Sequence, residues 1–179
     1  MFDPVKPNPV APDLVVSGSK APQLTVTRLR IDWARPDILL PFLALARQCA
    51  DAAQTSRGFI AGALWAEARL SFWTVTLWQD AASMRAFARG PSHSRAMRHL
   101  QRRGAGYSEA AFASGVSPTA QWPEAAEIVT FLQEKAIFYT LPHPSGDHLE
   151  KRIRPPKNYN AERLEPRLDT SGAHYDPAL

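Results

Sequence analysis

His93 is the residue whose type and position most favour chemistry. An imidazole titrates near neutral pH, so it can serve as an acid, a base or a metal ligand. Helical spacing places His93 on the apolar side of a helix that Ser92 can cap, together with Met97 and Leu100. The competing interpretation is a structural histidine bonded to a backbone carbonyl, because no carboxylate or second histidine nearby in the sequence would orient the ring for catalysis.

The opposite side of the same helix carries a row of arginines, Arg95, Arg98 and Arg102. Between Arg85 and Arg103 the sequence has six arginines and no acidic residue. Such a face can attract an anionic ligand, a nucleic-acid backbone or an acidic protein, whereas an ordinary solvated surface is the competing interpretation. Phe87 is the only ring besides the histidines, so base stacking is poorly supported and nucleic acid is not the expected partner.

The remaining reactive side chains form no motif for a metal or for nucleophilic chemistry. The single cysteine, Cys49, lies on the apolar stripe of a predicted helix, which indicates a packing role. Without further cysteines it forms neither an internal disulfide nor a common zinc cluster. Three histidines, His143, His148 and His174, are widely spaced in a proline-rich segment, and we expect no metal site from them.

The elements that must position these residues follow a strand–helix–strand–strand–helix order. Alternation and β-branched residues predict strands, helical spacing of apolar residues predicts helices, and glycine and proline mark their ends. The predicted strands are Leu24–Ile31, Phe59–Ala66, Phe72–Trp78, Tyr107–Ser114 and Ala136–Leu141. The predicted helices begin at Pro36, after Asp80, at Ser92 and near Pro123.

Both ends of the chain are rich in proline and lack periodicity, which predicts extended or disordered arms over residues 1–22 and 142–179. Residues 23–141 then form the folded domain. These arms could bind a protein partner. The chain has no apolar run of the roughly 20 residues that a membrane-spanning helix needs. Together with the single cysteine and the absence of a secretory signal pattern, this favours a cytoplasmic protein.

The run Phe72–Phe87, followed by His93–Met97, resembles monooxygenase-like proteins of the dimeric α/β-barrel superfamily. Within this superfamily the run resembles the spheroidene monooxygenase-like group and, more distantly, the antibiotic-biosynthesis monooxygenases. The shared features are an aromatic strand that ends in Trp and a polar cap, a helix with Met and Phe inside, and a His at the next helix start. The resemblance covers about residues 24–141. It implies a ferredoxin-like α+β unit with an antiparallel sheet, two copies of which close a barrel as a homodimer.

The resemblance also implies a pocket between the sheet and the helices. We expect its ligand-binding residues to be Trp65, Trp73, Trp78, Met97 and Tyr107, with His93 as the catalytic base. Plain core filling is the competing role for each tryptophan. The implied function is oxygenation of a small aromatic or polyene substrate without an organic cofactor. One alternative places haem in the pocket with His93 as axial ligand. Another is a non-catalytic homodimeric scaffold that binds a protein or a lipid surface through its arms and its arginines.

Overall fold

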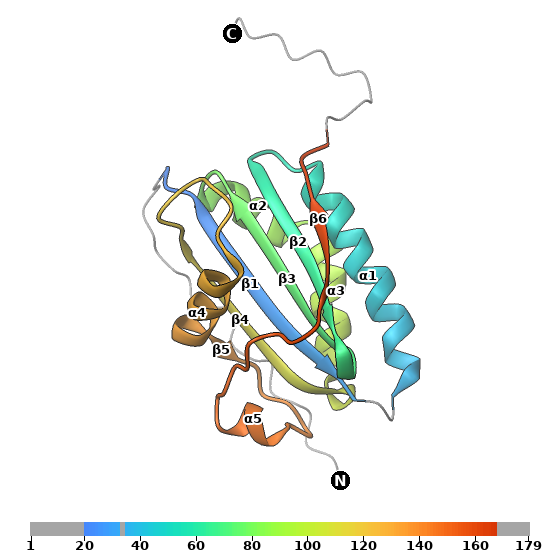
Figure 1. Cartoon of the computed structure of the whole chain (residues 1–179). Coiled ribbons are helices and arrows are strands. Elements are labelled where there is room, and N and C mark those ends of the chain that lie inside the picture. Colours follow the sequence, from blue (N-terminus) through green and yellow to red (C-terminus); the bar gives the residue numbers. More distant parts are fainter. Residues whose placement is uncertain (1–19, 33–34, 168–179) are drawn as a thin grey trace, which may run out of the picture.

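The computed structural model describes residues 20–32 and 35–167, and a six-stranded antiparallel sheet lies at its centre (Figure 1). The strand order is β5-β4-β1-β3-β2-β6. The strands are β1 (Gln23–Ile31), β2 (Phe59–Glu67), β3 (Ser71–Trp78), β4 (Tyr107–Val116), β5 (Ile137–Phe138) and β6 (Asn160–Leu164). The helices are α1 (Pro36–Gln54), α2 (Ala81–Arg89), α3 (Pro91–Arg102), α4 (Ala125–Lys135) and α5 (Gly146–Leu149). The four central strands and α1 to α3 form a ferredoxin-like unit, which confirms the predicted α+β class.

Two local predictions differ from the structure. The helix α3 is capped by Gly90 and not by Ser92, because Pro91 occupies its first turn, where a missing N–H group costs no hydrogen bond. The strand expected over Ala136–Leu141 shrinks to the two residues of β5, which pair with Ala111 and Phe112. The predicted cap of α2 is confirmed, since the Asp80 carboxylate accepts a hydrogen bond from the Ser83 N–H at 2.7 Å.

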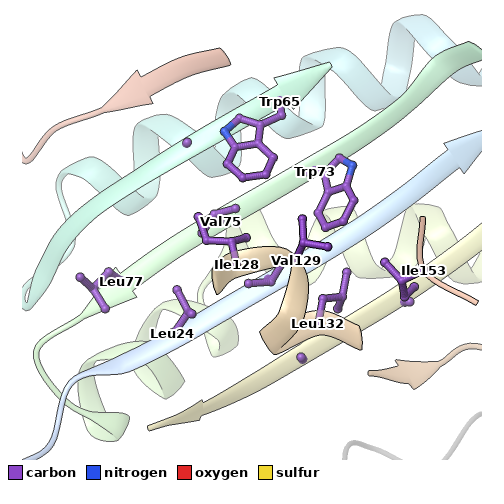
Figure 2. Close-up of a cluster of buried hydrophobic side chains, with 13 residues drawn as sticks. Leu24, Trp65, Trp73, Val75, Leu77, Ile128, Val129, Leu132 and Ile153 are labelled. Carbon is purple, nitrogen blue, oxygen red and sulfur yellow. The ribbon is translucent and has the colours of Figure 1, made fainter. Parts of the chain in front are cut away.

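One face of the sheet, here called the α4 face, is sealed by the chain itself. Paired residues such as Val26, Val75 and Ala113 point to this face and are almost completely buried. Figure 2 shows the side chains that cover them, which come from α4 and from the segment before β6: Ile128, Val129, Leu132 and Ile153. The largest of the three apolar clusters therefore lies on the side of the sheet away from α1, α2 and α3.

The other face, here called the helix face, lies under α1, α2 and α3 (Figure 1). One apolar cluster at its end joins Ile38 and Phe42 of α1 to Leu100 and Tyr107. A second cluster at the opposite end joins Ala50, Phe59, Trp78 and Phe87. Between the clusters the sheet presents four half-buried threonines, Thr25, Thr27, Thr74 and Thr76. The helix face is thus less tightly covered than the α4 face.

The chain after residue 141 adds to the sheet. It runs through α5, crosses the α4 face and ends in β6, which pairs with β2 (Figure 1). Ile153 and Leu164 are buried on the way, so the packed structure extends past the boundary expected at residue 141. Four of the five residues of β6 are exposed, which explains why no strand pattern is visible in the sequence. The outer parts of both arms, residues 1–19 and 168–179, lie outside the described residues.

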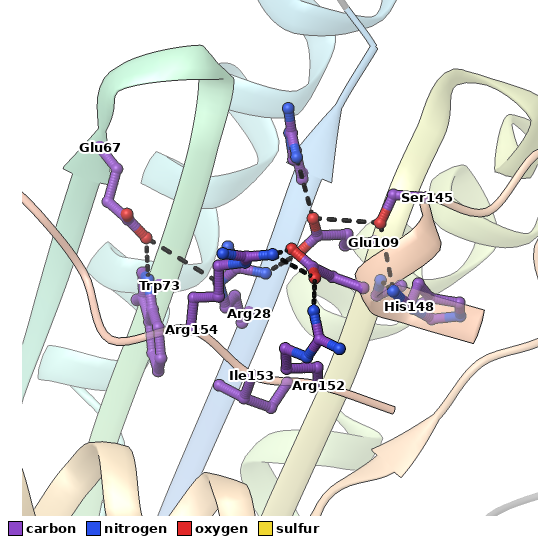
Figure 3. Close-up of polar contacts among 12 residues, drawn as sticks. Arg28, Glu67, Trp73, Glu109, Ser145, His148, Arg152, Ile153 and Arg154 are labelled. Carbon is purple, nitrogen blue, oxygen red and sulfur yellow. Dashed lines mark hydrogen bonds and ion pairs between the residues drawn. The ribbon is translucent and has the colours of Figure 1, made fainter. Parts of the chain in front are cut away.

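A buried ionic cluster fastens this C-terminal segment to the sheet (Figure 3). Glu109 of β4 pairs with Arg28, bonds Arg30 at 3.0 Å and accepts a hydrogen bond from the Ser145 hydroxyl at 3.2 Å. Arg28 and Glu109 are 6 % and 4 % exposed, so their charges are screened little by water. The cluster therefore ties the start of α5 to the two central strands that carry Arg28 and Glu109.

The homodimer expected from the resemblance stays a prediction. A second copy that closes a barrel over the α4 face would have to displace α4 and the segment with Ile153 and Tyr159, which pack on that face here. No helix in the described part of the chain is long and apolar enough to cross a membrane.

Candidate functional site

A cavity of about 590 Å³ opens between the C-terminal end of α1 and the two short helices α2 and α3. The break at Gly90 and Pro91 creates it, because the chain turns there and brings the start of α3 beside α2. Seven of its thirteen lining residues are polar or charged. They are Ser56, Arg57, Gln79, Asp80, Ser83, Ser92 and His93, and the apolar part comes from alanines, Gly90, Pro91 and Phe87.

His93 lines this cavity as a neutral imidazole. Its Nδ1 atom lies 2.9 Å from the carbonyl oxygen of Ala88, which can only accept, so the proton is assigned to Nδ1. Burial lowers the pKa of His93 below 6.5, although the bond to Ala88 acts in the opposite direction. The Nε2 atom is then an acceptor. The backbone bond expected from a structural histidine is present, and the same bond fixes the ring with the tautomer that a general base needs.

Polar groups beside His93 are held by the turn that precedes β2 and by the cap of α2. The hydrogen bond from the Ser83 N–H lowers the pKa of Asp80, so this carboxylate stays ionised. Gly58 has a φ of 77°, and a β-carbon there would overlap the Ser83 hydroxyl. Glycine at this position thus lets the Arg57 turn approach α2. The lining of the cavity thus combines one cation (Arg57), one anion (Asp80) and one neutral base (His93).

The structure separates the residues predicted to form one pocket. Trp78 packs behind Phe87, with ring centroids 5.0 Å apart, and does not line the cavity. Met97 and Tyr107 belong to the apolar cluster at the other end of the helix face. Trp65 and Trp73 lie on the opposite side of the sheet, among the core residues of the α4 face. Only His93 of the six predicted site residues borders the larger cavity.

Most residues of this cavity were not identified from the sequence as site residues. Asp80 was recognised as a helix cap, and Phe87 as a buried helix residue. Arg57, Gln79 and Ser83 carry no pattern that distinguishes them from turn and surface residues. The one available signal was the Gly90–Pro91 break, which predicts that the residues on both sides of it meet in space.

A second cavity of about 350 Å³ lies between α1 and the strands β2, β3 and β6. It is more apolar, and its walls include Phe42, Leu43, Leu64 and Phe72, with the rings of Phe42 and Phe72 4.8 Å apart. The strand residues Trp65 and Trp73 also border it, although they belong to the core cluster of the α4 face. At its mouth Arg47 of α1 bonds Glu162 of β6 at 2.5 Å. This cavity has an aromatic floor but no histidine.

The described tail histidines, His143 and His148, line neither cavity, and His174 lies outside the described residues. The structure has no group of three potential metal ligands among residues 20–32 and 35–167. His148 accepts a hydrogen bond from the Ala110 N–H at 3.4 Å and lies 2.8 Å from the Tyr139 carbonyl oxygen, so both of its nitrogens serve the packing of α5.

No protein-family model matches the chain, and no curated protein matches it in sequence. Solved structures of similar fold include a Bacteroides thetaiotaomicron protein described as a possible oxidoreductase, with 14 % identity, 55 % of this chain and 100 % of that chain covered, and a TM-score of 0.45. SnoaB, a cofactor-independent oxygenase from Streptomyces nogalater, has 18 % identity, coverage of 58 % and 99 %, and a TM-score of 0.41. A protein of unknown function from Nitrosomonas europaea has 20 % identity, coverage of 59 % and 97 %, and a TM-score of 0.43. Similarity at this level carries no information on activity or substrate.

Proposed function

We propose that this chain is a monooxygenase-like enzyme that binds a small aromatic substrate in the 590 Å³ cavity and uses His93 as its general base, without an organic cofactor. The observation that carries the proposal is the neutral His93 ring, fixed through Nδ1 by Ala88 at the cavity wall. The half-polar lining favours an aromatic substrate that bears hydroxyl groups over an apolar polyene, because unpaired polar groups in a filled cavity are costly.

In this reaction Nε2 of His93 takes a proton from the substrate, and the resulting electron-rich anion reacts with dioxygen directly. Arg57, which lines the same cavity, can stabilise the developing negative charge. A substrate methylene that becomes a carbonyl gives up two hydrogens, which leave with the second oxygen atom as water. The electrons then balance without an external reductant.

Haem fits the site poorly. The His93 tautomer suits an axial ligand, because its Nδ1–H bonds a carbonyl and its Nε2 is an acceptor. The walls do not suit a porphyrin, since they include the Asp80 carboxylate and several hydroxyl groups where an apolar slot is needed. Absorbance after haem addition tests this alternative, and a stoichiometric Soret band that the His93→Gln variant loses would support it.

The test of the proposed function combines binding and oxygen uptake for a panel of hydroxylated aromatic compounds. Ala86→Trp fills the mouth of the larger cavity, and Ala46→Trp is the matched control because it fills the smaller one. We expect Ala86→Trp to abolish binding and Ala46→Trp to leave it unchanged. His93→Gln should still bind but should consume oxygen no faster than protein-free buffer. Loss of binding with Ala46→Trp alone would move the site to the other cavity and contradict the role of His93.

A further inference from the structure

The outward side of α3 presents Arg95, Arg98 and Arg102 in one row. They are three, four and seven residues apart, which places them on one stripe of the helix that extends over about 10 Å. All three are exposed, and they lie opposite His93, Met97 and Leu100, which face the interior. The row is therefore fixed on a packed helix and points away from both cavities.

These three arginines differ from most other exposed arginines in their charge environment. Arg35, Arg163 and Arg167 each bond a carboxylate of the same chain, at 3.1, 3.1 and 3.0 Å. In the described part of the chain no carboxylate lies within ion-pair distance of Arg95, Arg98 or Arg102. Arg95 instead donates a hydrogen bond to Gln48 of α1 at 3.0 Å. The positive charge of the row is not neutralised internally.

The arrangement also costs helix stability. Arg95 and Arg98, and Arg98 and Arg102, are like charges at the spacings where helix neighbours repel, by about 0.2–0.5 kcal/mol each. The first turn of α3 contains no acidic residue and no capping side chain. By contrast, α4 begins with a capping box of Glu124 and Glu127, whereas the dipole of α3 is favoured only at its end, by His99 and Arg102. An external anion would relieve the repulsion on α3.

We propose that this row binds an acidic segment of a partner protein, with carboxylates spread over about 10 Å, as along two turns of a helix. The guanidinium fork suits carboxylates through paired hydrogen bonds. A membrane is disfavoured because α3 exposes no large apolar side chain that could insert, the exposed ones being Leu40, Leu43, Val116, Ile137 and Leu149 elsewhere. Single-stranded nucleic acid is disfavoured because the row includes no aromatic ring for stacking.

The test measures fluorescence anisotropy of a labelled helical peptide with glutamates at positions 1, 4 and 8, in about 0.15 M salt, where exposed charges are well screened. The variant Arg95→Gln/Arg98→Gln/Arg102→Gln should bind at least ten-fold more weakly than the parent chain. The matched control Arg35→Gln/Arg163→Gln/Arg167→Gln removes the same charge from internally paired arginines and should change binding less than two-fold. Binding of hydroxylated aromatics should stay unchanged in both variants, which separates this surface from the cavity.

Three outcomes would overturn the proposal. Equal weakening by both triple variants would mean that only net charge matters. If a peptide with the same composition but scattered glutamates bound as tightly as the test peptide, the spacing of the three arginines would play no part in binding. Tighter binding of the parent chain to anionic lipid vesicles or to a DNA duplex, lost in the α3 variant, would assign the surface to phosphate.

Discussion

The two faces of the sheet differ in how completely the chain covers them. On the α4 face, Val26, Val75 and Trp73 have no exposed surface, and α4 and the C-terminal segment pack directly on them. On the helix face the neighbouring Thr27 and Thr74 are half-buried, and both cavities lie on that side. The α4 face has one continuous apolar cluster, whereas the helix face has two separate clusters and both cavities.

The polar groups of the two faces differ in the same way. Arg28, Glu67 and Glu109 on the α4 face are engaged with one another and with Trp73, whose ring Nε1–H bonds Glu67 at 2.5 Å. Charged groups can be buried there only because partners are supplied on several sides. The hydroxyl groups of the helix face are neutral and tolerate partial exposure, so they can exchange water for a ligand at small cost.

The largest effect is expected from Glu109→Ala, which breaks the ionic cluster of the α4 face. It leaves Arg28 buried with Glu67, whose oxygen is 3.9 Å from Nε, and the more distant Asp147 as its counter-charges. An uncompensated buried charge lowers the free energy of unfolding by about 3–5 kcal/mol. Urea denaturation measures the loss. The control Glu162→Ala removes an exposed ion pair with Arg47 and should cost less than about 1 kcal/mol.

The paired replacement Arg28→Met/Glu109→Leu shows whether the cluster stabilises the fold or only avoids a penalty. Removing both charges together should restore the free energy of unfolding to within about 1 kcal/mol of the parent chain. A loss as large as that of Glu109→Ala alone would mean that the cluster itself holds the C-terminal segment in place.

A smaller effect is expected from neighbouring residues of β3 that face opposite ways. Val75 is completely buried on the α4 face, so Val75→Ala should lower the free energy of unfolding by about 2–3 kcal/mol. Thr74 points to the helix face and is half-buried, so Thr74→Ala should cost less than about 1 kcal/mol. Equal losses in urea denaturation would show that the helix face is as tightly packed as the other.

The sequence predicted the strands and helices well because each carries its own periodicity and end signals. Leu24–Ile31 alternates, Asp80 caps α2, and Gly90 with Pro91 ends it. Sequence patterns do not reveal which face of the sheet each later segment covers. Arg28 and Glu109 meet only because β1 pairs with β4 in the register that places Arg28 opposite Ala111. The short and exposed β6 gives no periodic signal at all.

Sequence patterns that do not reveal the faces of the sheet also explain why the predicted ligand-binding residues do not share one cavity. Trp65, Trp73 and Trp78 are all aromatic strand residues, and residue type alone gave no reason to separate them. Alternation places Trp73 and Trp78 on opposite faces, while the pairing of Trp65 with Trp73 places both on the α4 face. The place of His93 on the inward side of an amphipathic helix could be predicted from helical spacing, whereas its catalytic role stays a prediction. The groups around it come from three separate turns.

The pH dependence of stability tests whether His93 is buried as a neutral ring on the helix face. The pKa of His93 lies below 6.5 in the folded chain, whereas it is about 6.5 in the unfolded chain. The unfolded chain therefore binds more protons at pH values between the folded and the unfolded pKa. The free energy of unfolding should therefore fall as the pH decreases from 7.5 through 6.5, and His93→Gln should remove part of this slope. His99 also has a pKa lowered by burial and by Arg103, so His99→Gln is the matched control for the remaining part. An unchanged slope in His93→Gln would contradict a desolvated ring.

The smallest effect concerns Cys49 of α1, whose reactivity measures how often α1 separates from the helix face of the sheet. Burial raises the pKa of its thiol to about 11, so only a small fraction is thiolate at pH 8. Alkylation by iodoacetamide at pH 8 should be more than ten-fold slower than for free cysteine. Free-cysteine reactivity in the parent chain would mean that α1 separates from the sheet readily. The partial exposure of the threonines would then result from movement of α1 over the sheet and not from a permanent cavity.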